Sequence, residues 1–206
     1  MDGDHETSVS VDHRGDARDV LTRPVASPET RLAGEAPRVA SDSLRRIELP
    51  FEAEAWKDRL TGCDGPRLWD RDLASEQERN TRHRRTATIA LVELAGIDVA
   101  AERWGRDLAE QLFLRLSRVL ASGIRSSDHI ARIAPTRFGV LLVETDEILA
   151  INFVDRIKAM CASDIDPEVH GFRIAIGWAS PTVGGELAAA QELAGERLDD
   201  DLHRRA

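Results

Sequence analysis

Residues 86–94 read TATIALVEL, and this stretch decides the fold. It is a continuous apolar run, rich in β-branched residues, with one charged residue, Glu93, near its end. An apolar run without polar interruptions is typical of a strand that is buried on both faces. The sequence therefore predicts a strand here that is covered by other elements on each side.

Helical and strand-like patterns surround this strand. Helices are predicted where apolar residues recur every third or fourth position, and strands where short apolar runs are bounded by turn residues. A crossover, a hairpin and a second crossover then connect the strands, so we expect an α/β fold with a central mixed sheet flanked by helices. The predicted helices are 51–60, 66–80, 97–122, 148–161 and 186–198, and the further strands are 130–133, 138–143 and 172–179.

The composition suggests one folded domain with tails. The chain has 206 residues, of which 42% are apolar, which is enough to bury a core. Residues 1–50 contain no aromatic residue and half of the eight prolines. Such a segment buries too little apolar area to offset its ordering entropy, so it is predicted to be a disordered charged tail. The domain is expected over 51–198, followed by an acidic and basic tail at 199–206.

Charge and residue usage exclude several classes of function. The net charge is −9, aromatic residues make up 4% and Tyr is absent, so the chain is not expected to bind nucleic acid. Cys63 and Cys161 stand apart, and the scattered histidines, His129 among them, show no metal-ligand spacing, so no metal site is predicted. The sequence shows neither a signal peptide nor an apolar run of roughly 18 residues, which favours a cytoplasmic protein without membrane contact.

Four motifs occur in an order and at a spacing that resemble the GGDEF domain family, the diguanylate cyclases and their degenerate relatives. The resemblance covers about residues 56–194 and implies a nucleotidyl-cyclase-like fold. The motifs are DRLTG at 58–62, the helix at 97–113 with a Trp-Gly pair, DHIARI at 128–133 followed by Phe138, and RIAIGWA at 173–179.

The resemblance also shows what the chain lacks for catalysis. Active members of the family join two GTP molecules into cyclic di-GMP, with metal ions held by carboxylates. The signature hairpin GGDEF is replaced by APTRF at 134–138, so both glycines are lost and Thr136 and Arg137 stand at the acidic positions. Pro135 also removes a backbone N–H that could meet a phosphate. Glu93 stands at the metal-binding position of the first strand, where we expect a solvated strand-end side chain.

Substrate recognition is altered in the same way. The guanine-reading Asn of the family corresponds to Ala101, and a later Asp corresponds to Glu110. The late phosphate-binding Lys has no counterpart near residues 194–201. The resemblance therefore implies a domain without catalytic residues, metal or cofactor, and an active diguanylate cyclase is the function that the sequence favours least.

One ligand site of the family is retained. Arg125, Ser126, Ser127 and Asp128 match its RxxD inhibitory motif, which binds the product cyclic di-GMP. The supporting arginine of that site corresponds to Arg156, and Arg132 is a weaker further candidate. A guanidinium can fork onto a phosphate, and a carboxylate can accept from the guanine edge. Asp128 could instead brace the turn into the next strand, and the residues leave both interpretations open.

Two functions follow from this resemblance. The first is a catalytically inactive receptor that binds cyclic di-GMP through Arg125, Asp128, Arg156 and the weaker candidate Arg132. The alternative is a scaffold that binds no nucleotide and contacts a protein partner through a face of the domain or through the N-terminal tail. The sequence leaves the partner and the oligomeric state open.

Overall fold

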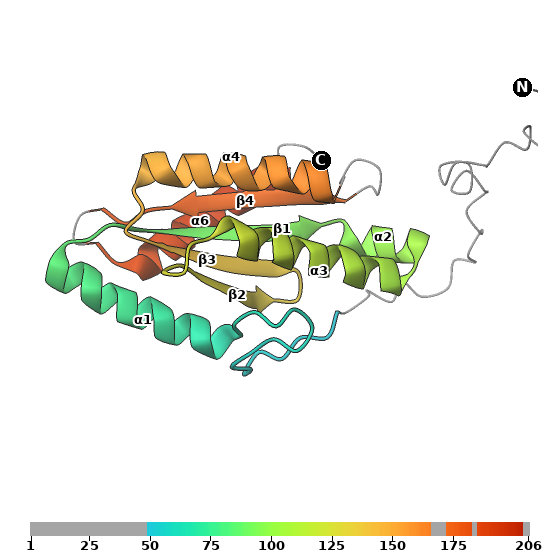
Figure 1. Cartoon of the computed structure of the whole chain (residues 1–206), viewed down its shortest axis with the longest axis horizontal. Helices are drawn as coiled ribbons and strands as arrows, with labels where there is room; N and C mark the ends of the chain where they lie inside the picture. Colours follow the sequence, from blue (N-terminus) through green and yellow to red (C-terminus); the bar gives the residue numbers. More distant parts are fainter. Residues whose placement is uncertain (1–48, 166–171, 183–184, 204–206) are drawn as a thin grey trace, which may run out of the picture. The chain divides into compact units, whose positions relative to one another are not determined.

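The predicted buried strand forms. In the computed structural model, which describes residues 49–165, 172–182 and 185–203, strand β1 spans Ala87–Ala95 and its first six residues are buried. β1 is an interior strand of a four-stranded sheet with the order β2-β3-β1-β4 (Figure 1). The other elements are α1 (Pro66–His83), α2 (Ile97–Trp104), α3 (Arg106–Gly123), β2 (His129–Ala134), β3 (Arg137–Val143), α4 (Glu147–Asp164), β4 (Arg173–Ala179) and α6 (Leu187–His203).

The prediction of a central sheet flanked by helices is confirmed, but the sheet is not mixed. All three pairings among the described strands are antiparallel. β1 and β2 run in the same direction, because both are antiparallel to β3, yet β3 lies between them. β1 separates β3 from β4 in the same way. Each crossover connection therefore passes over one strand, so no two parallel strands are neighbours in the sheet.

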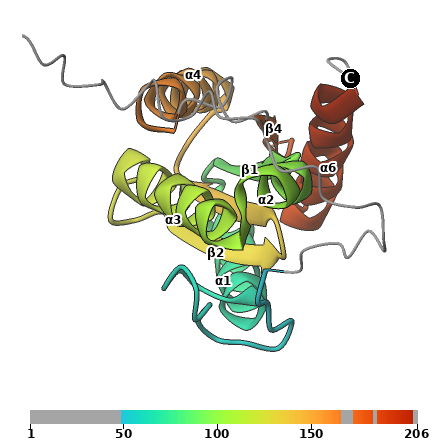
Figure 2. The same cartoon turned by 90° about the vertical axis from the view of Figure 1, so that its right-hand side faces the viewer.

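Side chains of β1 alternate between two apolar cores. Ala90, Val92 and Leu94 pack in one core with side chains of α2, α3 and α4. Ile89 and Leu91 pack in the other core with side chains of α1 and α6. Figure 2 shows the two groups of helices around the sheet. Because successive side chains of a strand point to opposite faces and both faces of β1 are covered, a continuous apolar run is needed at this position.

The predicted helix at 51–60 is wrong, because local hydrogen bonds favour a turn. Residues 51–65 form turns and two isolated bridges, Lys57↔Asp64 and Asp64↔Ala131. The Asp58 carboxylate accepts from the backbone N–H of Thr61 at 2.8 Å and from its hydroxyl at 2.7 Å. Side-chain bonds of this kind compete with helical ones. The DRLTG motif is therefore an ordered loop that leads into α1.

The predicted helix at 97–122 is divided at Gly105. This glycine has φ +96° and ψ 156°, a conformation that side chains rarely adopt, and it ends α2 and begins α3. The apolar spacing continues across the break, so it could not reveal the change of direction. The break lets α2 and α3 each direct buried residues at the same core.

The chain ends of the domain extend slightly beyond the predicted boundaries. Leu49 is 3% exposed and joins the core of α2, α3 and α4. Helix α6 continues past residue 198 to His203, and Asp201 accepts a hydrogen bond from the backbone N–H of Ile176 on the outer side of β4. Residues 1–48 of the predicted tail and residues 204–206 lie outside the described residues, so these parts of the domain prediction stay predictions.

We expect Gly177→Ala to lower stability and Gly195→Ala to raise it. A Cβ at Gly177 would lie 2.1 Å from the Ala194 carbonyl oxygen and 2.3 Å from the Leu198 nitrogen, so α6 would have to move away from β4. Overpacking of this kind costs about 1–3 kcal/mol. A Cβ at Gly195 meets only a Leu91 methyl at 4.0 Å, and alanine in a helix is favoured by about 0.5–1 kcal/mol.

Urea unfolding of both variants and the parent chain tests this pair. The two midpoints should shift in opposite directions. A Gly177→Ala midpoint equal to that of the parent chain would contradict the close packing of α6 against β4.

Candidate functional site

The altered signature hairpin holds an internal ion pair in place of a pair of acidic residues. Pro135 and Thr136 form the turn between β2 and β3, and Arg137 is the first residue of β3. Glu93 on β1 stands directly opposite Arg137 in the sheet register. Nε and Nη2 of Arg137 lie 2.7 and 2.6 Å from the same Glu93 carboxylate oxygen, Oε2.

This contact changes the role predicted for Glu93. The sequence suggested a solvated strand-end side chain, but the Glu93 side chain is only 20% exposed and is bound by Arg137. Asp199 of α6 lies 3.9 Å from the same guanidinium. The charge of the Arg137 guanidinium is thus shared by the carboxylates of Glu93 and Asp199. A metal ion at Glu93 would have to compete with this arginine.

The two positions that correspond to base-reading residues offer little to a guanine. Ala101 is 3% exposed and packs in the core with residues of α2 and α3. Glu110 on α3 forms an ion pair with Arg106 one turn earlier, at 2.9 Å. Neither side chain can replace the contact to guanine that the family's Asn amide makes at the position of Ala101.

The RxxD turn is braced by the Asp128 carboxylate. Asp128 Oδ2 accepts from the backbone N–H of Arg125 at 2.9 Å, and the Asp128 N–H donates to the Arg125 carbonyl at 3.0 Å. Oδ1 accepts from the N–H of Val143 at the end of β3, at 3.1 Å. Oδ1 also accepts from the Ser127 hydroxyl at 3.4 Å. Asp128 therefore has the bracing role that the sequence left open, while Oδ2 retains a lone pair for another donor.

Arg156 reaches the same turn from another helix. Its Nη2 on α4 donates to the carbonyl of Gly123, the last residue of α3, at 2.7 Å. The Arg125 side chain is exposed and has no hydrogen bond or ion pair within the part of the chain that the structure describes. Arg125 and Asp128 thus share the loop between α3 and β2, and Arg156 of α4 is bonded to the residue two positions before Arg125.

Arg132 lies elsewhere and has a structural role. Its side chain is fully buried, and Nη1 donates to the Pro50 carbonyl at 2.6 Å and to Asp58 Oδ1 at 2.9 Å. Nη2 donates to the Pro135 carbonyl at 2.7 Å. A side chain that is enclosed by protein cannot grip a ligand at the surface. We therefore remove Arg132 from the predicted ligand-binding residues.

The buried guanidinium is held between aromatic rings as well as oxygens. It lies 4.7 Å from the ring centre of Phe113 and 5.4 Å from that of Phe51. Burial lowers the pKa of Arg132, and the charge and hydrogen bond of Asp58 oppose this shift. The Asp58 contact thus offsets part of the desolvation that burial imposes.

A family model for the diguanylate cyclase GGDEF domain matches residues 55–199. The chain belongs to the GGDEF family. The probable diguanylate cyclase DgcC of Escherichia coli K12 is 29% identical over 137 residues, which cover 66% of this chain and 37% of that relative. The chain therefore corresponds to little more than a third of the curated relative that it matches.

Solved structures show the same fold. The GGDEF domain of DgcB from Caulobacter crescentus, solved with cyclic di-GMP, aligns with a TM-score of 0.67 and 14% identity over 76% of this chain and 95% of that one. The diguanylate cyclase SiaD of Pseudomonas aeruginosa, solved with its activator SiaC, aligns with a TM-score of 0.65 and 19% identity over 74% of this chain and 60% of that one. Among the described helices, none is long and apolar enough to span a membrane.

We expect Arg132→Met to destabilise the domain strongly. The substitution removes the partner of a buried carboxylate and leaves the carbonyls of Pro50 and Pro135 without their donor. Loss of one member of a buried ion pair costs about 3–5 kcal/mol. Arg59→Met is the matched control, because the Arg59 side chain is 87% exposed. Urea unfolding should show a large fall for Arg132→Met and little change for Arg59→Met; equal effects would contradict the assigned role.

Proposed function

We propose that this chain is a catalytically inactive GGDEF domain that acts in cyclic di-GMP signalling by binding the dinucleotide at its RxxD turn. The observation that carries the proposal is the ion pair of Arg137 and Glu93, while the guanidinium of Arg125 on the RxxD turn has no partner among the described residues. The first feature opposes synthesis, and the second favours binding of an anion. We propose a cytoplasmic location on the same basis, since cyclic di-GMP is a ligand of the cytoplasm in this family.

The case against synthesis rests on charge at the hairpin. Attack of a 3′-hydroxyl on an α-phosphate requires metal ions that neutralise the developing phosphate charge. Arg137 supplies positive charge at the hairpin, but a guanidinium cannot activate a hydroxyl as a metal does. It also binds Glu93, the carboxylate at the family's metal-binding position on β1. The buried Ala101 adds the loss of a base contact.

We expect no cyclic di-GMP when the purified chain is incubated with GTP and Mg²⁺ or Mn²⁺, as measured by chromatography of the products. Restoring GGDEF at 134–138 should not recover synthesis, because Ala101 still cannot bind guanine. An active diguanylate cyclase assayed in parallel provides the control. Cyclic di-GMP formation above the background of a reaction without protein would refute the inactive assignment.

The case for binding rests on the charges around the turn between α3 and β2. Arg125 is exposed and unpaired among the described residues, so it meets a phosphate without breaking an existing contact. Arg156 uses one nitrogen for the Gly123 carbonyl and keeps its other N–H groups. Asp128 is fixed by two backbone donors and the Ser127 hydroxyl, so the remaining lone pair of Oδ2 is preorganised for the guanine edge.

We expect cyclic di-GMP to bind in a calorimetric titration, and Arg125→Ala to weaken binding by about ten- to a hundredfold. Charge-assisted hydrogen bonds to phosphate contribute roughly 1.5–3 kcal/mol, which corresponds to this range. Arg156→Ala should weaken binding less, and Asp128→Asn should mainly reduce the preference for guanine over adenine dinucleotides. Arg103→Ala, an exposed arginine on α2, is the control for a change of net charge.

Two results would count against this site. Binding that survives Arg125→Ala unchanged would show that the ligand lies elsewhere. A titration without heat, together with an unchanged melting temperature at high micromolar ligand, would refute the receptor proposal and favour the scaffold.

The scaffold alternative is supported by exposed apolar side chains at the start of α4. Ile148 is 71% exposed, Ile151 is 45% exposed and Leu149 lies beside them. Apolar side chains grouped on a surface often mark a protein contact. A partner captured equally well by the chain and by an Ile148→Asp, Ile151→Asp variant would show that this surface is not used.

A further inference from the structure

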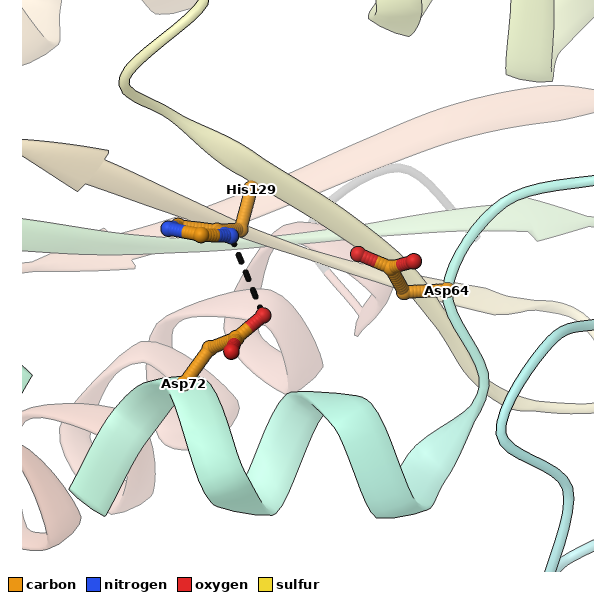
Figure 3. Close-up of side chains that lie close together, drawn as sticks. All are labelled: Asp64, Asp72 and His129. Carbon is orange, nitrogen blue, oxygen red and sulfur yellow. Dashed lines mark ion pairs between the residues drawn. The ribbon is translucent and has the colours of Figure 1, made fainter. Parts of the chain in front are cut away.

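Three possible metal ligands meet at the junction of α1 and β2, away from the signature hairpin. Asp64 precedes α1, Asp72 lies on α1 and His129 begins β2. One donor atom of each lies within 4.8 Å of the others. Figure 3 shows the three side chains approaching from these separate elements, with the His129 ring beside the Asp72 carboxylate. Nδ1 of His129 lies 3.0 Å from Asp72 Oδ2.

We propose that Asp64, Asp72 and His129 bind a divalent transition-metal ion such as Zn²⁺. One imidazole with two carboxylates is a donor set that suits this group of ions. Donor atoms bound to Zn²⁺ at about 2.0–2.1 Å lie roughly 3.3 Å apart in a tetrahedral site, so the His129–Asp72 pair already has a suitable separation. The metal replaces the proton at Nδ1, and only the Asp64 side chain has to move closer.

A third carboxylate, that of Glu76, supports the site. Glu76 lies one turn after Asp72 on α1 and is 2% exposed, and its Oε1 has no hydrogen-bond partner among the described groups. Asp72 and Glu76 are four positions apart on α1, so their side chains lie on the same face of this helix. A buried oxygen without a partner is costly, and water bound to a metal in this cluster is a donor that would satisfy it.

The basic side chains that now pair with Asp64, Asp72 and Glu76 can move into solvent when a metal binds. Lys57 pairs with Asp64, Arg71 with Asp72 at 2.9 Å and Arg79 with Glu76 at 3.2 Å. Each of these basic side chains is more than half exposed. The carboxylates of Asp72 and Glu76 are only 8% and 3% exposed, and a cation with a double charge in the cluster would keep these buried charges compensated.

The backbone around the cluster is fixed, and solvent can reach it. The Asp64 N–H donates to the Ile130 carbonyl at 3.2 Å, and the Arg132 N–H donates to the Asp64 carbonyl at 2.8 Å, which ties the loop before α1 to β2. Asp64 and His129 also line an open pocket of about 310 Å³. This pocket gives a hydrated ion a path to the ligands and room for the water that completes its coordination.

Calorimetric titration of the chelator-treated full chain with Zn²⁺ tests the proposal. We expect one ion per chain, bound with micromolar affinity, and at least tenfold weaker binding for both Asp64→Asn and His129→Ala. Zn²⁺ should raise the melting temperature of the parent chain and not that of Asp64→Asn, because the ion links three segments of the folded state. Asp64→Asn keeps the fold testable, since it removes only the contact with exposed Lys57.

Two control variants separate this site from other positions. His83→Ala removes an exposed histidine at the end of α1, and Glu93→Gln alters the carboxylate that corresponds to the metal position of the family. Both should bind Zn²⁺ as the parent chain does. Absence of micromolar binding, or equal binding by the parent chain, Asp64→Asn and His129→Ala, would overturn the proposal.

Discussion

The arrangement of the domain depends on one buried guanidinium, that of Arg132. It connects Pro50 at the start of the domain, Asp58 in the DRLTG loop and Pro135 in the hairpin, three parts of the chain that no common helix or strand holds together. Part of the cost of burying this charge is offset because both terminal nitrogens donate to oxygens and the group lies near two aromatic rings. The DRLTG motif around Asp58 therefore stabilises the packing of this chain, and this role does not depend on whether the hairpin supports catalysis.

The pairing of β1 with β3 explains how the hairpin keeps its shape with Thr136 and Arg137 in place of acidic residues. The register places Glu93 opposite Arg137, so opposite charges face each other across two neighbouring strands. Cross-strand pairs of opposite charge stabilise a sheet, whereas an unpaired carboxylate beside a second one would repel it. An arginine at this position thus supplies from within the chain the positive charge that a metal would otherwise bring, and the hairpin remains folded without a ligand.

Several parts of this structure could be predicted from sequence, and the reasons for the remainder are physical. The run around Ile89 reveals a strand buried on both faces, because strand periodicity is a local property. The break at Gly105 and the turn around Asp58 could not be predicted in the same way, since backbone angles and side-chain bonds there override the apolar pattern. The burial of Arg132 and the meeting of His129 with Asp64 and Asp72 depend on contacts between distant segments, which spacing along the chain does not encode.

Strand β2 separates the RxxD turn from the signature hairpin, as a domain that binds without synthesis, which we propose, requires. The RxxD turn precedes its first residue, His129, and the altered hairpin follows its last residue, Ala134. At about 3.3 Å per residue the two ends lie roughly 20 Å apart, so a substitution in the hairpin does not reach the turn directly. Asp128 is held by Arg125 and by Val143 at the far end of β3, and neither contact involves residues 134–138. The contacts of Asp128 therefore do not depend on the hairpin residues, so the binding that we propose at this turn does not require a hairpin that supports synthesis.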